Sequence, residues 1–557
     1  MVKNKNTAFR ISMMVAVAMV MSACTSSGGL GVKAKAKLPN AATFSPTRIE
    51  ADIAFLADDL LRGRDTGSEG HRIAAKYVAA EFNRQGLKPA GGTGYFQEVP
   101  MRTASLNMDA SSMRIIINGE AQALALGDEF MMYGNVISAE GDVTAPVVYV
   151  GYGIHAPNLG HDDLENIDLA GKIALVVSGA PKSFHTEIRA HHGSSKTKGV
   201  ELLKRGALGY VSVISPTDEK RRPFKTYKKY LGNKSFGWLP PESDKDKPKF
   251  KAAATINHEV AATMFKATGK NLDEVLAATE EGAVGGFPLN AEINMHRKSD
   301  VSEVFETPNV VAILEGSDPV LKNEYVVISA HLDHIGVSKN AKGEDKINNG
   351  ALDNAAGVSV MLEVARAYAN APVKPRRSIL FAAVTGEERG LLGAEYFATY
   401  PTVDKAAIVA NVNIDMPILL YNFTDVVAFG AERSSLGPIT AQAVSKIGVN
   451  LSPDPMPQEG IFTRSDHYRF VQQGIPSVFL VTGWGMDTAG KNGGEIFMEF
   501  LSKTYHSPAD EIDQAIDYSA GAKFAYVNWL ITSAIANDNE RPRWNDGDFF
   551  GETFAGK

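Results

Sequence analysis

Residues 324–336 read EYVVISAHLDHIG, and three further stretches continue the pattern: NNGALDNAAGVS (348–359), SILFAAVTGEERGLLG (378–393) and AAIVANVNIDM (406–416). Three apolar, β-branched runs predict buried strands at Val326–Ser329, Ser378–Val384 and Ala407–Val412. The segment Ala355–Tyr368, between the first two runs, predicts a helix. Buried strands alternating with a helix indicate an α/β fold.

Each predicted strand ends in side chains that can bind a metal ion. These are His331 and Asp333, then Glu387 and Glu388, then Asp415, with Asp353 between the first two strands. Ligands gather at the carboxyl ends of the strands in an open α/β sheet, so we expect these side chains to lie close together. Imidazole and carboxylate are the protein ligands of catalytic zinc.

If Asp353 binds two metal ions, two sets of metal ligands are complete. The first set would be His331, Asp353 and Asp415. The second set would be Asp353, Glu388 and a distant histidine, for which the candidate is His506 in KTYHSPADE. Two metal ions about 3.5–4 Å apart can generate hydroxide and hold both oxygens of a tetrahedral intermediate. Glu387, next to a ligand, could then take the proton from the bridging water as general base.

The same residue types also occur without metal. A lone HxD pair is more often structural, and a lone pair of glutamates is more often a solvated face. Ligand-type groups at three successive strand ends, with Asp353 between them, favour the metal site.

Five ordered motifs, AHLDH, GALDNAAG, TGEERGLLG, NIDM and YHSPAD, resemble those of the di-zinc aminopeptidase and glutamate carboxypeptidase-type exopeptidases. The resemblance runs from about Val301 to the C-terminus. It implies a bridging Asp353, a general base at Glu387 and terminal metal ligands at His331, Asp415, Glu388 and His506. It further implies that the Asp333 carboxylate orients the first histidine and that the Tyr505 phenol helps to stabilise an oxyanion.

The resemblance also implies the fold class: a mixed, mostly parallel sheet flanked by helices, with an inserted, mostly-β protease-associated domain. Residues 151–181 (GYGIHAPNLGHDDLENIDLAGKIALVVSGAP) resemble that insert. We therefore expect the N-terminal part of the peptidase domain at 45–137, the insert at 138–298 and the zinc-peptidase catalytic domain at 299–557. Arg62, Gly63, Arg64 and Gly67 resemble a family loop or form a simple helix-ending turn. In TRSDH, His467 is expected to contact substrate or support a ligand rather than bind metal.

The N-terminus predicts export. Lys3, Lys5 and Arg10 precede the apolar run Ile11–Met21, and Met21-Ser22-Ala23-Cys24 resembles a bacterial lipobox. We expect a lipoprotein signal peptide at 1–23 and a flexible tether at 24–44, with a lipid on Cys24 holding the protein to the outer membrane facing the periplasm. A periplasmic or secreted protein without the lipid is the alternative.

The charge and composition of the chain limit the kinds of partner that we expect it to bind. The formal charge of −7 over 557 residues is mild and mixed along the chain, which argues against a nucleic-acid partner. No stretch of about 20 apolar residues follows the N-terminus.

The favoured function is a two-zinc exopeptidase acting on peptides, with aminopeptidase preferred by family frequency. A carboxypeptidase on the same site, a catalytically inactive scaffold or binding lipoprotein, and a single-zinc cyclising acyltransferase are the alternatives. Cobalt or manganese could replace zinc. Side-chain preference, peptide length, the role of the insert and the oligomeric state stay open.

Overall fold

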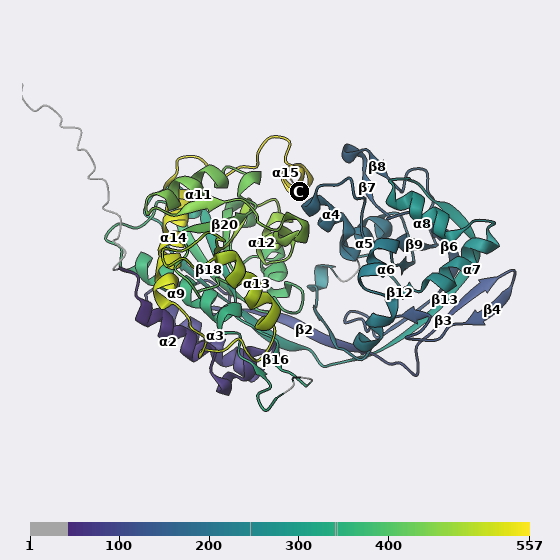
Figure 1. Ribbon diagram of the computed structural model, residues 1–557, viewed down its shortest axis with the longest axis horizontal. Helices are drawn as coiled ribbons and strands as arrows, with labels where there is room; N and C mark the ends of the chain where they lie inside the picture. Colours follow the sequence, from purple (N-terminus) through teal and green to yellow (C-terminus); the bar gives the residue numbers. More distant parts are fainter. Residues whose placement is uncertain (1–42, 245–246, 340, 342, 557) are drawn as a thin grey trace, which may run out of the picture. The chain divides into compact units, whose positions relative to one another are not determined.

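The computed structural model describes residues 43–244, 247–339, 341 and 343–556 (Figure 1). The expected signal peptide at 1–23, with Cys24, and nearly all of the expected tether lie outside the described residues. Within the described part of the chain, no helix is both long enough and apolar enough to cross a membrane.

The strands that carry the candidate site form what we call the central sheet. Its spatial order is β11 (Ser235–Trp238), β2 (Phe96–Leu106), β14 (Phe305–Leu314), β18 (Ser378–Val384), β15 (Tyr325–His331), β19 (Ile408–Ile414), β22 (Ser477–Thr482), β20 (Asp425–Phe429) and β21 (Asn450–Ser452). Strands β18, β15, β19 and β22 are parallel to one another, and the strands flanking them are antiparallel. The predicted α/β class and the three predicted strands are confirmed.

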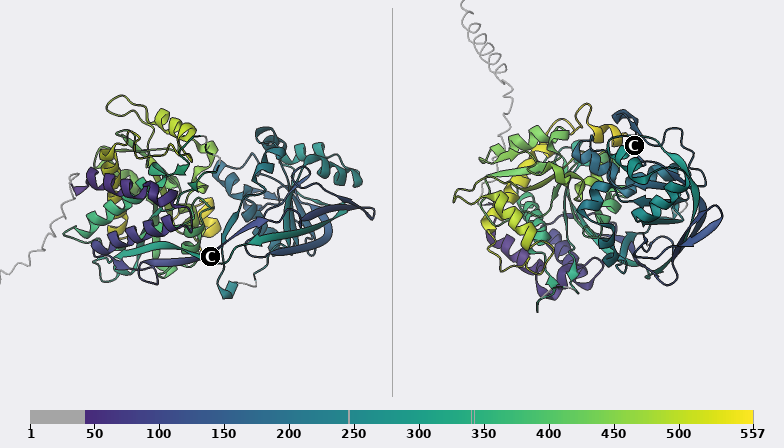
Figure 2. Two further views of the ribbon diagram at one scale, coloured as in Figure 1. Left: turned by 90° about the horizontal axis from the view of Figure 1, so that it is seen from below. Right: turned by 45° about the vertical axis from the view of Figure 1, so that its right-hand side comes forward.

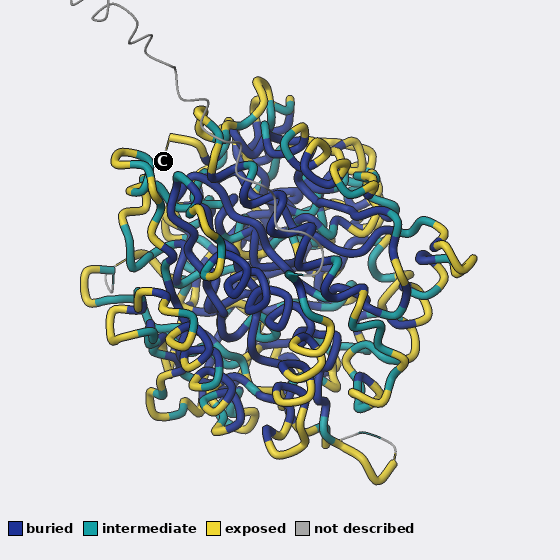
Figure 3. The backbone as a smooth tube through the Cα atoms, turned by 90° about the vertical axis from the view of Figure 1, so that its left-hand side faces the viewer, coloured by how far each residue is buried: buried dark blue, intermediate teal, exposed yellow. Residues whose placement is uncertain are grey.

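Helices cover both faces of this sheet because its strands are apolar on both sides. On β15, Val326 and Ile328 belong to one core and Val327 to the other. The first core includes residues of α2 (Pro46–Leu56), α3 (Glu69–Arg84), α9 (Ala356–Ala369), α11 (Leu436–Ser445), α13 (Gly493–Lys503) and α14 (Tyr518–Asn537). The second core includes residues of α10 (Leu392–Thr399) and α12 (His467–Val471). Figure 3 shows the buried backbone gathered in the interior and the exposed segments around it.

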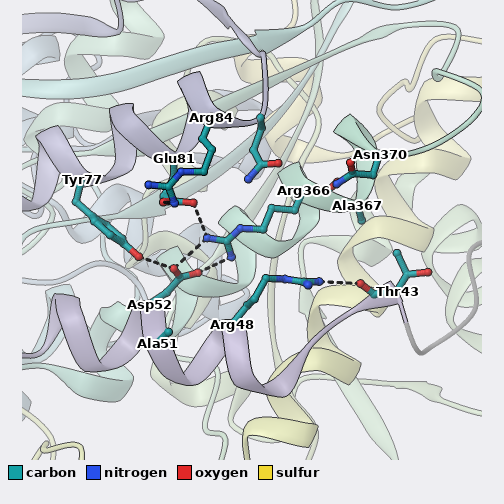
Figure 4. Close-up of a pocket in the computed structure, with 11 residues that line it drawn as sticks. Thr43, Arg48, Ala51, Asp52, Tyr77, Glu81, Arg84, Arg366, Ala367 and Asn370 are labelled. Carbon is teal, nitrogen blue, oxygen red and sulfur yellow. Dashed lines mark hydrogen bonds and ion pairs between the residues drawn. The ribbon is translucent and has the colours of Figure 1, made fainter.

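A buried ion cluster ties α9 to the two N-terminal helices. Arg366 of α9 donates to both oxygens of Asp52 at 2.7 and 3.0 Å, and to Glu81 at 2.9 Å (Figure 4). The Tyr77 hydroxyl also donates to Asp52, at 2.6 Å. The purple α2 and α3 therefore lie against elements formed much later in the chain (Figure 2). This cluster fixes α9, which begins at Ala356, after the turn that contains Asp353.

A second group of strands forms what we call the insert sheet. Its order is β4 (Glu120–Ala123), β3 (Ser112–Ile117), β13 (Phe287–Val301), β6 (Glu140–Tyr149), β9 (Ile173–Val177), β10 (Gly209–Val213), β12 (Ala252–Ile256) and β5 (Phe130–Met131). The helices of this part are α4 (Thr186–Gly193), α5 (Ser195–Lys204), α6 (Pro216–Arg221), α7 (His258–Ala267) and α8 (Leu272–Glu280).

The strand pairings show that the chain passes from the central sheet to the insert sheet before residue 138, the expected start of the insert. Leu106 of β2 pairs with Ser299, whereas Ser112 of β3 already pairs with His296 in the insert sheet. Strands β3 and β4 thus join the insert sheet although they fall within the range 45–137. The alternating pattern of residues 112–117 predicts a strand, but it does not specify a partner so distant in the chain.

The C-terminal segment ends in a short helix, α15 (Phe549–Phe554). The rings of Phe550 and Phe554 contact the imidazole of His191 in α4, with ring centroids 6.0 and 5.6 Å apart. Arg433 forms ion pairs with Glu187 of α4 and with Asp548 at the start of α15. The end of the chain therefore packs against a helix of the insert.

Candidate metal centre

The predicted metal ligands meet at the carboxyl edge of the central sheet. His331 is the last residue of β15, Asp415 directly follows β19, and Glu388 lies in the loop after β18. Parallel strands that point the same way bring their carboxyl ends to one edge. Asp353 reaches this edge from the turn before α9, where its peptide bond to Asn354 is cis.

The first ligand group consists of His331, Asp353 and Asp415. Nε2 of His331 lies 3.2 Å from Oδ1 of Asp353 and 3.0 Å from Oδ1 of Asp415. The atoms that these three residues offer to a metal all lie within 4.8 Å of one another, and all three residues are buried. This group corresponds to the first predicted ligand set.

The main chain, not a carboxylate, orients His331. Nδ1 of His331 lies 3.1 Å from the backbone carbonyl oxygen of Asp333 and can donate its proton there, which leaves Nε2 free as a ligand. The Asp333 carboxylate instead accepts from the Thr66 hydroxyl at 2.9 Å and from the Glu387 backbone N–H at 3.1 Å. The expected role of Asp333 is therefore corrected: its side chain positions the loop that carries Glu387.

The second ligand group shares Asp353 and adds Glu388. Nε2 of His506 lies 3.2 Å from Oδ2 of Asp353 and 3.0 Å from Oε2 of Glu388. A second histidine, His334, approaches the same carboxylates with Nδ1 2.7 Å from Oε1 of Glu388. His334 lies in the motif AHLDH but is not among the ligands that the sequence predicts. Spacing alone does not reveal which histidine of that motif faces the site.

A series of buried hydrogen bonds holds the Asp415 carboxylate in place. The side-chain amide of Asn411 donates to Ser329, Ser329 donates to Asn413, Asn413 donates to Ser465, and Ser465 donates to Oδ2 of Asp415 at 2.6 Å. Ser465 is thus the residue of TRSDH that touches a ligand. His467 packs between the rings of Phe462 and Phe479, with ring centroids 5.2 and 5.4 Å away, rather than joining either ligand group.

The turn that carries Asp353 is held by two residues that the sequence analysis did not place in the site. The carboxylate of Asp510, in the motif YHSPAD, accepts from the backbone N–H groups of Leu352 and Asp353 at 2.9 and 3.0 Å. The buried guanidinium of Arg64 donates to the backbone carbonyls of Leu56, Leu332, Asn349 and Gly350. Arg62, Gly63 and Arg64 all adopt positive φ values, so the RGR segment is a tight turn that places Arg64 beneath the site.

The surroundings of Glu387 and Tyr505 raise the pKa of both side chains. Removal from solvent and the nearby carboxylates of Asp415 and Glu388 raise the pKa of Glu387 well above its ordinary range, although His331 opposes this shift. Burial, with the field of the Asp353 and Glu388 carboxylates, raises the pKa of the Tyr505 phenol. A carboxylate with a raised pKa suits proton transfer near neutral pH, and a protonated phenol can donate a hydrogen bond.

The residues present fit divalent cations. Oε1 of Glu388 and both ring nitrogens of His334 are buried without a hydrogen-bond partner among the described residues. Burial raises the pKa of Asp466 to about 8, with Asp415 adding to the shift and His331 opposing it. Buried carboxylates in such excess are costly unless cations neutralise them. Carboxylate and imidazole donors in this arrangement suit zinc.

The fold and these two groups define an α/β domain with a candidate metal centre, and comparison with known proteins shows which family it is similar to. Residues 309–532, which contain every residue of both ligand groups, match Peptidase family M28. This match covers less than half of the chain and includes the whole candidate site.

Individual relatives match over shorter lengths. A "Probable zinc metalloprotease" of Pyrenophora teres f. teres (strain 0-1) is 40% identical over 110 residues, 19% of this chain and 22% of the relative. A "probable leucine aminopeptidase 2" of Aspergillus oryzae is 27% identical over 245 residues, 42% of this chain and 45% of the relative. The chain thus spans less than half the length of both. The solved aminopeptidase from Aneurinibacillus sp. strain AM-1 aligns with a TM-score of 0.48 at 20% identity, covering 90% of this chain and 96% of that one.

Proposed function

We propose that the protein is a two-zinc aminopeptidase that removes N-terminal residues from peptides. One observation carries this proposal: two groups of carboxylate and imidazole side chains share Asp353, and Glu387 lies beside both. The match of residues 309–532 to a peptidase family and the similarity to a leucine aminopeptidase support peptide hydrolysis from the N-terminus.

In the proposed reaction, the metal ligands, Glu387 and Tyr505 would each have a separate role. Two zinc ions held by these groups would polarise the peptide carbonyl and lower the pKa of water. Glu387 would accept a proton from the attacking water and return it to the nitrogen of the leaving amine, a transfer that its raised pKa favours. Tyr505 would donate a hydrogen bond to the negative charge that develops on the carbonyl oxygen.

The alternatives differ in what they require of the site. An inactive scaffold would not need to keep its ligands, whereas all the residues of both groups are present and lie close together. A single-zinc acyltransferase would need only one group. A carboxypeptidase would use the same centre and differ in which end of the substrate is held.

Metal content measured together with hydrolysis of free-amine and N-acetylated peptides tests the proposal. We expect two metal ions per chain and hydrolysis only of peptides with a free amine. The variant Asp353→Ala, which lacks the shared carboxylate, should lose both. Hydrolysis of blocked peptides that carry a free carboxylate would establish a carboxypeptidase instead, and metal near one per chain would favour the acyltransferase.

We also propose that the protein is exported and lipid-anchored through Cys24. The support is the basic, then apolar N-terminus that ends in Met21-Ser22-Ala23-Cys24. We expect Cys24→Ser to move the protein from the membrane fraction to the soluble fraction, and an unchanged distribution would contradict the anchor.

A further inference from the structure

We propose that His334 is a direct ligand of the second metal ion, together with Asp353 and Glu388. The inference rests on the metal centre of the proposed function, but not on its substrate. It gives the second group a buried imidazole, that of His334, besides the partly exposed imidazole of His506.

The burial of His334 calls for a partner. The residue is completely inaccessible to solvent, and both of its ring nitrogens lack a hydrogen-bond partner among the described residues. A buried polar group without a partner costs about 1–3 kcal/mol. A cation bound at Nδ1 would remove much of that cost.

The position of Nδ1 fits a metal ligand. It lies 2.7 Å from Oε1 of Glu388, and neither atom has a hydrogen-bond partner among the described residues. It lies 3.8 Å from Oδ2 of Asp353. Zinc–nitrogen and zinc–oxygen bonds of about 2.0–2.1 Å place ligand atoms of a tetrahedral site about 3.3 Å apart. The two observed separations bracket that value, as expected if both atoms face one cation.

The backbone around His334 fixes the ring in this place. The His334 N–H donates to the carbonyl oxygen of Arg64, at 3.3 Å. The ring also lies against Gly350, where an added Cβ would approach its Cγ and Cδ2 atoms to 2.7 Å. Gly350 has a φ of +60°, so glycine serves both the turn and the close approach of the ring.

His506 differs from His334 in its surroundings. Its side chain is 36% exposed, whereas that of His334 is fully buried. His506 comes from a turn in which its own φ is +54°. The second metal would therefore be held from the interior by a fixed histidine and from the solvent side by an exposed one, so loss of His506 alone should leave this metal bound, though more weakly.

A competition titration tests the contribution to affinity. Metal-free wild type, His334→Ala and the control His71→Gln are titrated with Zn²⁺ against a chromophoric chelator. His71 is also fully buried, but it bonds Thr307 and belongs to neither ligand group. We expect His334→Ala to weaken the second equivalent of Zn²⁺ at least tenfold and to leave the first unchanged, with His71→Gln like wild type.

A spectroscopic variant separates direct binding from an effect through Glu388. Co²⁺-loaded His334→Cys should show a thiolate-to-cobalt charge-transfer band that Co²⁺-loaded wild type lacks. Weaker Zn²⁺ binding without this band would make His334 a positioning residue and overturn the ligand role. Unchanged affinity in His334→Ala, or fewer than two ions in wild type, would overturn it as well. Two ions without peptide hydrolysis would refute the proposed function alone.

Discussion

Glu387 differs from its neighbour Glu388 in the atoms that its side chain faces. Glu388 lies within 3.0 Å of both histidines of the second group, whereas Glu387 takes part in neither group. Its backbone N–H is fixed by the Asp333 carboxylate, and its pKa is raised by loss of solvent and by neighbouring acids. Adjacent residues of one loop are therefore suited to different tasks: one to bind metal, the other to carry a proton.

The variant Glu387→Gln tests this division. A glutamine cannot accept the proton, so we expect kcat to fall by about 10²–10⁴-fold. Two metal ions should still bind, because Glu387 is not a ligand. The neighbouring variant Glu388→Gln should instead lose the second metal. Near-normal kcat in Glu387→Gln, measured at full metal loading, would remove Glu387 from the role of base.

At the residue scale, the sequence predicts every member of the first ligand group and most of the second. His331, Glu388 and Asp415 were recognisable because each lies at or just after the end of an apolar run, where the side-chain type and the strand end indicate the same site. Asp353 and His506 were predicted from their ligand type and from the resemblance of their motifs. His334 and Asp510 lie in quoted motifs, but nothing in their spacing shows where they face. The orientation of His331 by a backbone carbonyl leaves no trace in residue identity.

Among the elements, α9 depends on Arg366. Its guanidinium lies among Asp52, Glu81 and Glu363, and is itself nearly buried. We expect Arg366→Met to lower the free energy of unfolding by about 3–5 kcal/mol, because it leaves the buried Asp52 carboxylate without the cation that pairs with it. Chemical denaturation measures the change.

Arg72 offers a control of the same residue type. It pairs with Glu98 at 2.7 Å, but both side chains are partly exposed. Arg72→Met should cost at most about 1 kcal/mol. Equal losses in the two variants would show that the cluster around Arg366 does not fix α9.

In the insert, α5 buries a lysine. Lys198 donates to the carbonyl oxygens of Val177 and Gly179 at 3.0 and 2.6 Å. Burial lowers its pKa to about 7, although Asp163 and Asp218 oppose the shift. Between this pKa and the unfolded value of about 10.4, the unfolded chain binds more protons than the folded one. This group therefore makes stability increase as pH rises through that window.

Comparison of wild type with Lys198→Met isolates this effect. From pH 7.5 to 9.5, we expect the free energy of unfolding of wild type to rise relative to the variant by about 1.4 kcal/mol per pH unit. Lys204→Met, which alters an exposed lysine of the same helix, should keep the wild-type slope. Parallel profiles for wild type and Lys198→Met would mean that Lys198 stays protonated in the fold.

Strands with a strong apolar pattern were predictable from the sequence, but the strands with which they pair were not. The runs that form β15, β18 and β19 are buried on both faces and could be recognised from composition alone. The range 112–117 also predicts a strand correctly. Its place in the insert sheet depends on pairing with β13, which lies far later in the sequence. The residues around position 138 alone do not reveal this pairing, so a domain limit drawn there leaves β3 outside the insert.

For the whole molecule, the metal centre should contribute to stability. Buried carboxylates converge where α9, β15, β18 and β19 meet, and bound cations would neutralise them. A ligand present at about 1,000 times its Kd stabilises a folded protein by about 4 kcal/mol. We expect a chelator to lower the midpoint of thermal unfolding and Zn²⁺ to restore it.

The variant Asp353→Ala supplies the control, because without the shared carboxylate its unfolding midpoint should not respond to the chelator. A wild-type midpoint that is equally insensitive would contradict a stabilising metal centre.

The pairing of Leu106 with Ser299 has a consequence for how the chain could have been assembled. The segment between these residues leaves and re-enters the central sheet on adjacent, hydrogen-bonded strands, and on the way it adds β11 to the edge of that sheet. Because the two ends of the segment are already held together, its length adds little entropic cost to closing the sheet. A change of length in the segment away from β11 would therefore leave the strands that carry the metal ligands in place.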